Sequence, residues 1–166
     1  KTDNYVVRAK AIMVLGEIIN LSWDDKNSCQ WPENKRDLLR STTPVFLEQV
    51  LSIVTDPTQP YRVLQAANFP LSILNHLPVD KKLSEKIEIT YQNAFKNRDA
   101  YPIEYQTNLA AIMIYTYKKM ELEPEIKEIR EKIIKGIENG KDLKNLLTTI
   151  DRVLYFLQKQ KQSSKP

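Results

Sequence analysis

The 166 residues are enough for one domain with a buried core, and only three of them are glycine. Few glycines beside many leucine, isoleucine, lysine and glutamate residues favour helices over hairpins, so we expect an all-α protein. No apolar run is long enough to span a membrane, and the single cysteine excludes an internal disulfide.

The formal net charge of +4 is concentrated towards the C-terminus. Residues 1–117 hold 13 basic and 13 acidic residues, whereas residues 118–166 hold 12 basic and 8 acidic ones. A basic helix can bind phosphates, so a nucleic acid or an anionic surface is an alternative partner, bound through Lys144, Arg152 and Lys159. A solvated helix face explains the same spacing.

Amphipathic segments separated by turn signals predict seven helices. We expect Asp3 to cap the first helix, Pro44 to open the second, and Asn139-Gly140 to end the sixth. The last residues, 161–166, are polar and predict a flexible tail. The predicted helices span residues 5–20, 45–54, 61–76, 82–97, 104–119, 125–138 and 142–160.

Every second predicted helix repeats one pattern, in which an apolar residue is followed at intervals by a small residue and two more apolar ones. We call these positions the repeat frame. Successive frames are 56, 43 and 40 residues apart, and periods near 40 to 47 are typical of two-helix solenoid units. The four frames are Val7, Ala11, Leu15, Ile18; Val63, Ala67, Leu71, Leu74; Gln106, Ala110, Ile114, Tyr117; and Leu146, Ile150, Leu154, Leu157.

The stretch TPVFLEQVLSIVTDPTQPYRVLQAANFPLSIL resembles one HEAT repeat, with an Asp-Pro turn between two helices and a small pair at Ala66-Ala67. DNYVVRAKAIMVLGEI resembles the second helix of a preceding repeat, so we expect the chain to begin in mid-repeat. The resemblance covers nearly the whole chain and departs from the HEAT pattern at Gln106 and Ile150.

The resemblance implies a right-handed α-α superhelix of about 3.5 HEAT-like hairpins. It predicts a single solenoid domain over residues 1–160. It also implies a non-enzymatic scaffold that binds a protein or peptide on its concave face, without a cofactor or metal. The compartment stays open: the cytoplasm is favoured, and export after removal of a signal also fits.

A shift of one or two residues from the frame marks the row expected to line the concave face. In the first helix this row is apolar, Ala9, Ile12, Gly16 and Ile19, which predicts that residues missing from this sequence, another subunit or a ligand cover it. Elsewhere the row is polar and predicts a partner-binding ridge, although a solvated face has the same composition. The predicted ridge residues are Gln65, Asn68, Ser72, Asn75, Asn108, Tyr115, Lys118, Asp151 and Tyr155.

The first interval between frames exceeds the others by about 13 residues, which predicts a loop insertion at about residues 21–43. This insertion contains WDDKNSCQW, with both tryptophans and the only cysteine. Trp23 and Trp31 are expected to anchor the loop or to contact a partner. An enzymatic or metal site would require Cys29 with His76 and Asp24 or Asp25, a poor ligand set.

Overall fold

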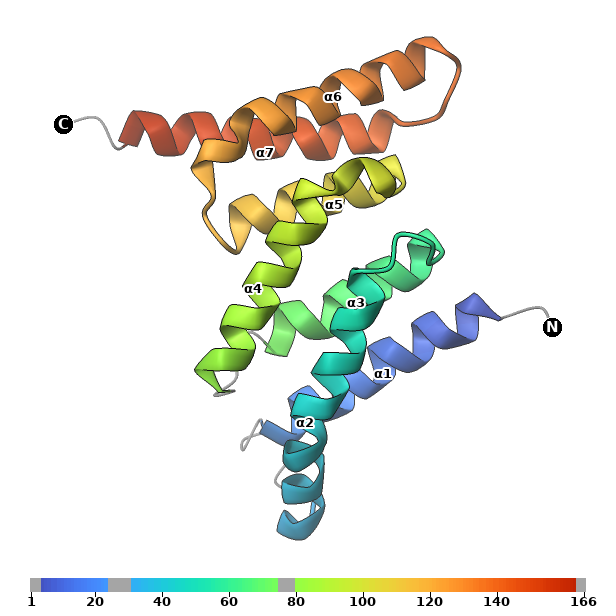
Figure 1. Ribbon diagram of the computed structural model, residues 1–166, viewed down its shortest axis with the longest axis vertical. Coiled ribbons are helices and arrows are strands. Elements are labelled where there is room, and N and C mark those ends of the chain that lie inside the picture. The colour runs from blue at the N-terminus through green and yellow to red at the C-terminus, as the bar shows by residue number, and fades with distance from the viewer. Residues whose placement is uncertain (1–3, 24–30, 75–79, 164–166) are drawn as a thin grey trace. The chain divides into compact units, whose positions relative to one another are not determined.

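The computed structural model describes residues 4–23, 31–74 and 80–163 (Figure 1). These residues form seven α-helices and two 3₁₀ turns and contain no strand, which confirms the all-α prediction. Six residues with a predicted role lie outside the described ranges: Asp3, Asp24, Asp25, Cys29, Asn75 and His76.

The described chain divides into two compact units, Lys1–Thr90 and Tyr91–Pro166. Each unit is described by itself below, and the single 1–160 domain stays a prediction. The elements are α1 (Tyr5–Trp23), α2 (Glu33–Val54), α3 (Tyr61–Leu74), α4 (Lys81–Lys96), η1 (Arg98–Ala100), α5 (Ile103–Tyr115), η2 (Met120–Leu122), α6 (Glu123–Glu138) and α7 (Lys144–Ser163).

The prediction that α2 begins at Pro44 is wrong, because α2 begins at Glu33 and contains Pro44 in its interior. Proline removes one N–H donor from a helix, but it does not prevent helix formation where other contacts hold the chain. Here Arg40 Nε donates to the Ser22 carbonyl at 2.9 Å, and Thr43 and Leu47 are buried. Residues 33–43, expected in the loop insertion, are therefore helical.

Three other helix ends differ from the predicted ones by three or four residues, and the first is that of α1, which continues to Trp23 and not only to Asn20. Helix α5 ends at Tyr115, four residues earlier than expected, because Lys118 adopts a left-handed backbone with φ 56°. Helix α7 continues to Ser163, three residues into the predicted tail. The predicted end of α6 is confirmed, and Gly140 has φ 80°. The Gly140 N–H donates to the Ile137 carbonyl at 2.9 Å, and the Lys141 N–H donates to the Gly136 carbonyl at 2.9 Å.

Unit 1 is built on the packing of α1 against α3, with α2 packed on both. Gly16 permits a close approach of α1 to α3, since a Cβ there would lie 2.7 Å from Cβ of the buried Pro70. Arg8 Nη2 also donates to Gln59 Oε1 at 3.0 Å, which ties α1 to the turn before α3. The buried apolar residues of this unit include Leu47, Val54, Val63, Leu64, Ala67, Leu71 and Ile87.

The face of α1 that packs in unit 1 is not the one expected from the repeat frame. The frame residues Val7, Ala11 and Leu15 are exposed, whereas Gly16 and Ile19 are buried. The apolar row of Ala9, Ile12, Gly16 and Ile19 therefore needs no outside cover, because α3 packs against it. The sequence pattern of α1 does not show which side of the helix is buried, because residues on both sides are hydrophobic.

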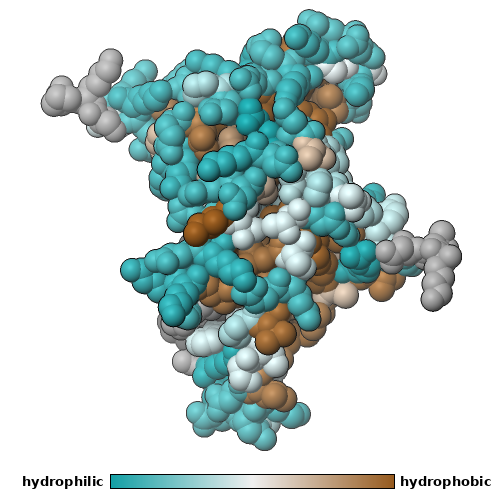
Figure 2. Space-filling model, viewed as in Figure 1, coloured by the Kyte–Doolittle hydropathy of each residue, from teal (hydrophilic) through white to brown (hydrophobic). Residues whose placement is uncertain are grey.

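Unit 2 contains α5, α6 and α7, and α6 and α7 lie side by side as an antiparallel pair (Figure 1). In this unit the frame faces inward, with Gln106, Ala110, Ile114, Ile150, Leu154 and Leu157 buried. Arg98 pairs with Glu128 at 2.6 Å, and Lys132 pairs with Asp99, so η1 is tied to α6. The outer surface of α6 is largely hydrophilic (Figure 2).

No helix among the described residues is long and apolar enough to cross a membrane.

Candidate binding surface

Three aromatic and three basic side chains gather in unit 2, on α7, at the end of α5 and in the turn after α5. The aromatic rings are those of Tyr115, Tyr155 and Phe156, and the cations are Lys118, Arg152 and Lys159; we call these six residues the aromatic–basic surface. Their spacing along α7 explains the grouping, because residues 152, 155, 156 and 159 fall on one side of a helix of 3.6 residues per turn.

Tyr115 and Phe156 join the two helices at this surface. Their rings meet edge to face with centroids 5.2 Å apart, a favourable aromatic geometry. Tyr115 is nevertheless 41% exposed, and Phe156 is half-buried. Partial burial raises the pKa of Tyr115, while the nearby Arg152 guanidinium acts in the opposite direction. Tyr115 therefore presents a protonated hydroxyl, able to donate and accept hydrogen bonds.

Lys118 reaches the Phe156 ring from the turn after α5. Its ammonium nitrogen lies 5.2 Å from the Phe156 ring centroid, a cation–π distance. Among described residues other than glycine, Lys118 alone has a positive φ, and such a conformation costs about 1–2 kcal/mol. The turn after α5 thus places this cation over the ring at the expense of backbone strain.

Tyr155 and Lys159 form the outer part of the surface. The Lys159 ammonium lies 5.1 Å from the Tyr155 ring centroid, and Tyr155 is 57% exposed. No carboxylate belongs to these six residues. The surface therefore offers cations and tyrosine hydroxyl groups to a partner.

A groove of about 470 Å³ between α6 and α7 borders the aromatic–basic surface at Tyr155. Its wall holds Arg130, whose Nε donates to Asp151 Oδ1 at 2.7 Å, and this contact raises the pKa of Arg130. Asp151, a predicted ridge residue, is thus paired with α6. The groove residues are Lys127, Arg130, Glu131, Asp151, Leu154, Tyr155 and Gln158.

The predicted ridge is brought together only in part. Tyr115, Lys118 and Tyr155 share the aromatic–basic surface, with Asp151 beside it. Asn108 is half-buried on α5 of the same unit. Gln65 and Ser72 are exposed on α3 of unit 1, where Asn68 is half-buried.

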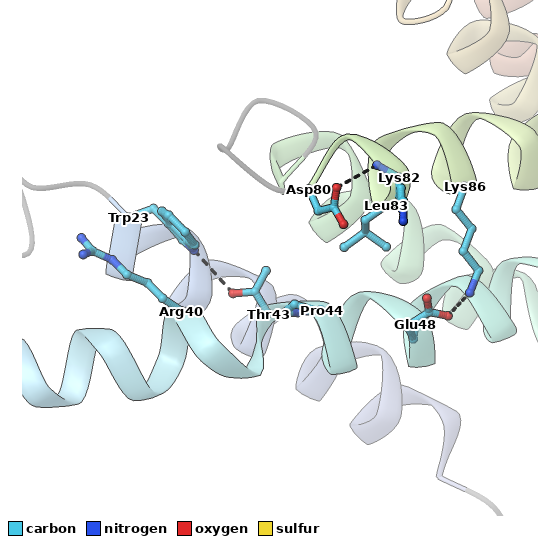
Figure 3. Close-up of a pocket in the computed structure, with 9 residues that line it drawn as sticks. All are labelled: Trp23, Arg40, Thr43, Pro44, Glu48, Asp80, Lys82, Leu83 and Lys86. Carbon is cyan, nitrogen blue, oxygen red and sulfur yellow. Dashed lines mark hydrogen bonds and ion pairs between the residues drawn. The ribbon is translucent and has the colours of Figure 1, made fainter.

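Trp23 lines a pocket of about 390 Å³ in unit 1, between the end of α1, α2 and the start of α4 (Figure 3). The indole Nε1 donates to Thr43 Oγ1 at 3.4 Å, and the Arg40 guanidinium lies 5.2 Å from the ring centroid. Leu83 and Pro44 add apolar wall, and Lys86 pairs with Glu48 across the pocket. Trp23 is therefore the last residue of α1 and is held in place by α2, and its predicted role as a loop anchor or partner contact stays a prediction.

Trp31, the other predicted loop contact, is half-buried just before α2. The Cys29 and His76 hypothesis cannot be placed, because both residues lie outside the described ranges. Within those ranges, no group of three His, Cys, Asp or Glu residues could hold a metal ion.

The sequence prediction missed Phe156 as the centre of the aromatic–basic surface. It assigned Tyr155 to the ridge and Arg152 and Lys159 to a separate basic helix, so it treated neighbouring side chains as two alternatives. The spacing of 152, 155, 156 and 159 along one helix was a signal available in the sequence.

The sequence matches no protein-family model, and no curated protein and no solved structure shows significant similarity to it.

Proposed function

We propose that the protein is a non-enzymatic scaffold that binds an acidic segment of a partner polypeptide at the aromatic–basic surface. The observation that carries this proposal is the gathering of Tyr115, Tyr155 and Phe156 with Lys118, Arg152 and Lys159. Tyrosine and arginine are enriched at protein interfaces because they combine contact area with hydrogen bonding. The three cations attract carboxylates and favour fast association.

Peptide binding fits this surface better than nucleic-acid binding. Single-stranded nucleic acids stack their bases on exposed aromatic faces. Here Lys118 lies over the Phe156 ring and Lys159 over the Tyr155 ring, and Tyr115 meets Phe156 edge to face. Lys118 and Tyr115 therefore cover part of the Phe156 ring, and Lys159 covers one side of the Tyr155 ring, which favours contacts through hydroxyl and ammonium groups over base stacking.

We also propose that the chain is a HEAT-like right-handed superhelix whose frame-bearing helices line the concave face. Two pairings within the units support this arrangement: α1 packs on α3, and α5 packs on α7. Sequential helices also pair, as α2 with α3 and α6 with α7. Within unit 1, Gln65 and Ser72 are exposed on α3 and stay predicted binding residues, together with Asn68.

The binding proposal can be tested by fluorescence anisotropy with short glutamate-rich peptides that contain tyrosine or leucine. We expect the Tyr155→Ala, Lys159→Ala double variant to bind such peptides at least about tenfold more weakly than the unsubstituted protein. Lys144→Ala is the matched control, since it removes an exposed cation of α7 outside the surface. Its binding should stay close to that of the unsubstituted protein.

Binding of a single-stranded oligonucleotide, measured at low and high salt, tests the alternative that the partner is a nucleic acid. Tighter binding of the oligonucleotide than of any acidic peptide, with a steep loss at high salt, would favour the nucleic-acid function. Equal weakening by Lys144→Ala and by the double variant would show that total charge, and not this surface, governs binding.

A further inference from the structure

Helix α1 carries an exposed apolar stripe that the proposed function does not use. Val7, Val14 and Leu15 are 59%, 56% and 48% exposed, Ala11 is exposed and Ile18 is half-buried. Their spacing places these five residues on one side of α1, turned away from the side of Gly16 and Ile19 that packs on α3. Hydrophobic surface is visible beside the N-terminal end of α1 (Figure 2).

The corresponding face of other frame-bearing helices is buried. Val63, Ala67 and Leu71 occupy the frame of α3, and α2 packs on that helix within unit 1. Ile150, Leu154 and Leu157 occupy the frame of α7, on which α6 packs within unit 2. The stripe of α1 occupies the same frame positions, so its shape and spacing suit a helix as the covering element.

Charges beside the stripe make α1 complementary to itself in the antiparallel direction. Lys10 and Glu17 are exposed and seven residues apart, so they lie on the same side of the helix, next to the stripe. The midpoint of Lys10 and Glu17 lies between Met13 and Val14. The midpoint of the stripe lies between Ile12 and Met13, so the two midpoints are one residue apart. An antiparallel pair of α1 helices that joins the stripes therefore brings each Lys10 near Glu17 of the other copy.

We infer that the protein forms a two-fold symmetric dimer through the apolar stripe of α1, with the occupant being α1 of a second copy. A two-fold axis presents the same patch on both partners, so one stripe covers the other. Burial of Val7, Val14 and Leu15 from both copies supplies the apolar centre of the interface. The two reciprocal Lys10–Glu17 pairs at its edge fix the antiparallel register.

Sedimentation velocity of the full chain over a concentration series up to about 100 μM tests this dimer. We expect a dimer with a dissociation constant of about 10 μM or tighter. The Val14→Gln, Leu15→Gln double variant should remain a monomer throughout the series. Leu38→Gln is the matched control, because it removes an apolar side chain of unit 1 that is 64% exposed on α2, and should leave the dimer intact.

Charge exchange tests the register independently of the apolar contact. Lys10→Glu alone should raise the dissociation constant by about tenfold, because it places like charges together in both pairs. Addition of Glu17→Lys should restore the dissociation constant to near its original value. Circular dichroism should show the same helix content in all variants.

Three results would overturn the inference. First, if the unsubstituted protein is a monomer at every concentration, a second copy does not cover the stripe. A dimer that survives Val14→Gln, Leu15→Gln must use another surface. Failure of the charge exchange to restore association contradicts the antiparallel register.

Discussion

Gly16 shows how a single missing side chain sets the packing of unit 1. Glycine costs helix stability, yet it stands in the middle of α1. Its value lies in the contact with α3, because any Cβ would come within 2.7 Å of Pro70 Cβ. Pro70 is buried inside its own helix and cannot move aside easily.

We expect Gly16→Ala to lower the free energy of unfolding by about 1–3 kcal/mol, because steric overlap exceeds the gain of about 1 kcal/mol in helix propensity. Urea denaturation followed by circular dichroism measures this change. Gly136→Ala is the control: its nearest contact is the flexible end of Leu143, so stability should stay constant or rise slightly. Equal effects of the two substitutions would argue against a tight α1–α3 contact.

Helices α6 and α7 are held together at one end by an ion-pair cluster. Glu123 in the first turn of α6 accepts hydrogen bonds from Lys127 at 2.8 Å and from Lys161 near the end of α7. These two ammonium groups lower the pKa of Glu123 to about 2. The N-terminal end of a helix also favours a carboxylate. The cluster therefore connects the last turns of α7 to the start of α6, although those turns of α7 are polar.

The depressed pKa predicts how this cluster responds to acid. A carboxylate whose pKa is lowered by folding stabilises the protein above its unfolded pKa of about 4.5, and the contribution is lost as the pH falls towards about 2. We expect Glu123→Gln to cost up to about 1 kcal/mol at neutral pH, since water screens such exposed pairs. The difference from the unsubstituted protein should disappear near pH 2 in chemical denaturation.

Hydrogen exchange locates the same effect in the chain. In Glu123→Gln the amides of the last turns of α7 should exchange faster, whereas those near Ile150 should keep their protection. Glu121→Gln, an exposed neighbour in η2, is the control. A similar pH profile for both variants would mean that the Lys161 contact contributes nothing measurable.

Across the whole chain, charge is divided between the two units. Residues 1–90 hold 11 basic and 11 acidic residues, and residues 91–166 hold 14 and 10, so the net charge of +4 belongs to unit 2. The aromatic–basic surface lies in that unit. An anionic partner is therefore expected to approach unit 2 preferentially.

The proposed superhelix predicts an elongated molecule. A compact chain of 166 residues has a radius of gyration of about 15 Å, and a solenoid of the same length should exceed it. Small-angle X-ray scattering on the Val14→Gln, Leu15→Gln variant measures this value without a contribution from the inferred dimer. A radius close to that of a compact chain would contradict the superhelix.

The sequence by itself determined the helical class, most helix positions and the Asn139-Gly140 end of α6. Local signals suffice there, because helix propensity, apolar spacing and glycine at a left-handed position act within a few residues. The frame also predicted the buried positions of α3, α5 and α7, where polar residues mark the opposite side. Tyr115, Lys118 and Tyr155 were assigned to the ridge from the same spacing, and their role in binding stays a prediction.

Only the tertiary structure decided which face of α1 is buried, that α2 continues through Pro44, and that Phe156 joins the predicted tyrosines to the basic residues. Each of these depends on residues far away in the sequence. Gly16 is matched to Pro70, Arg40 to Ser22, and Phe156 to Tyr115. Packing energy between distant segments overrides local preference, and a single sequence contains no direct record of those pairings.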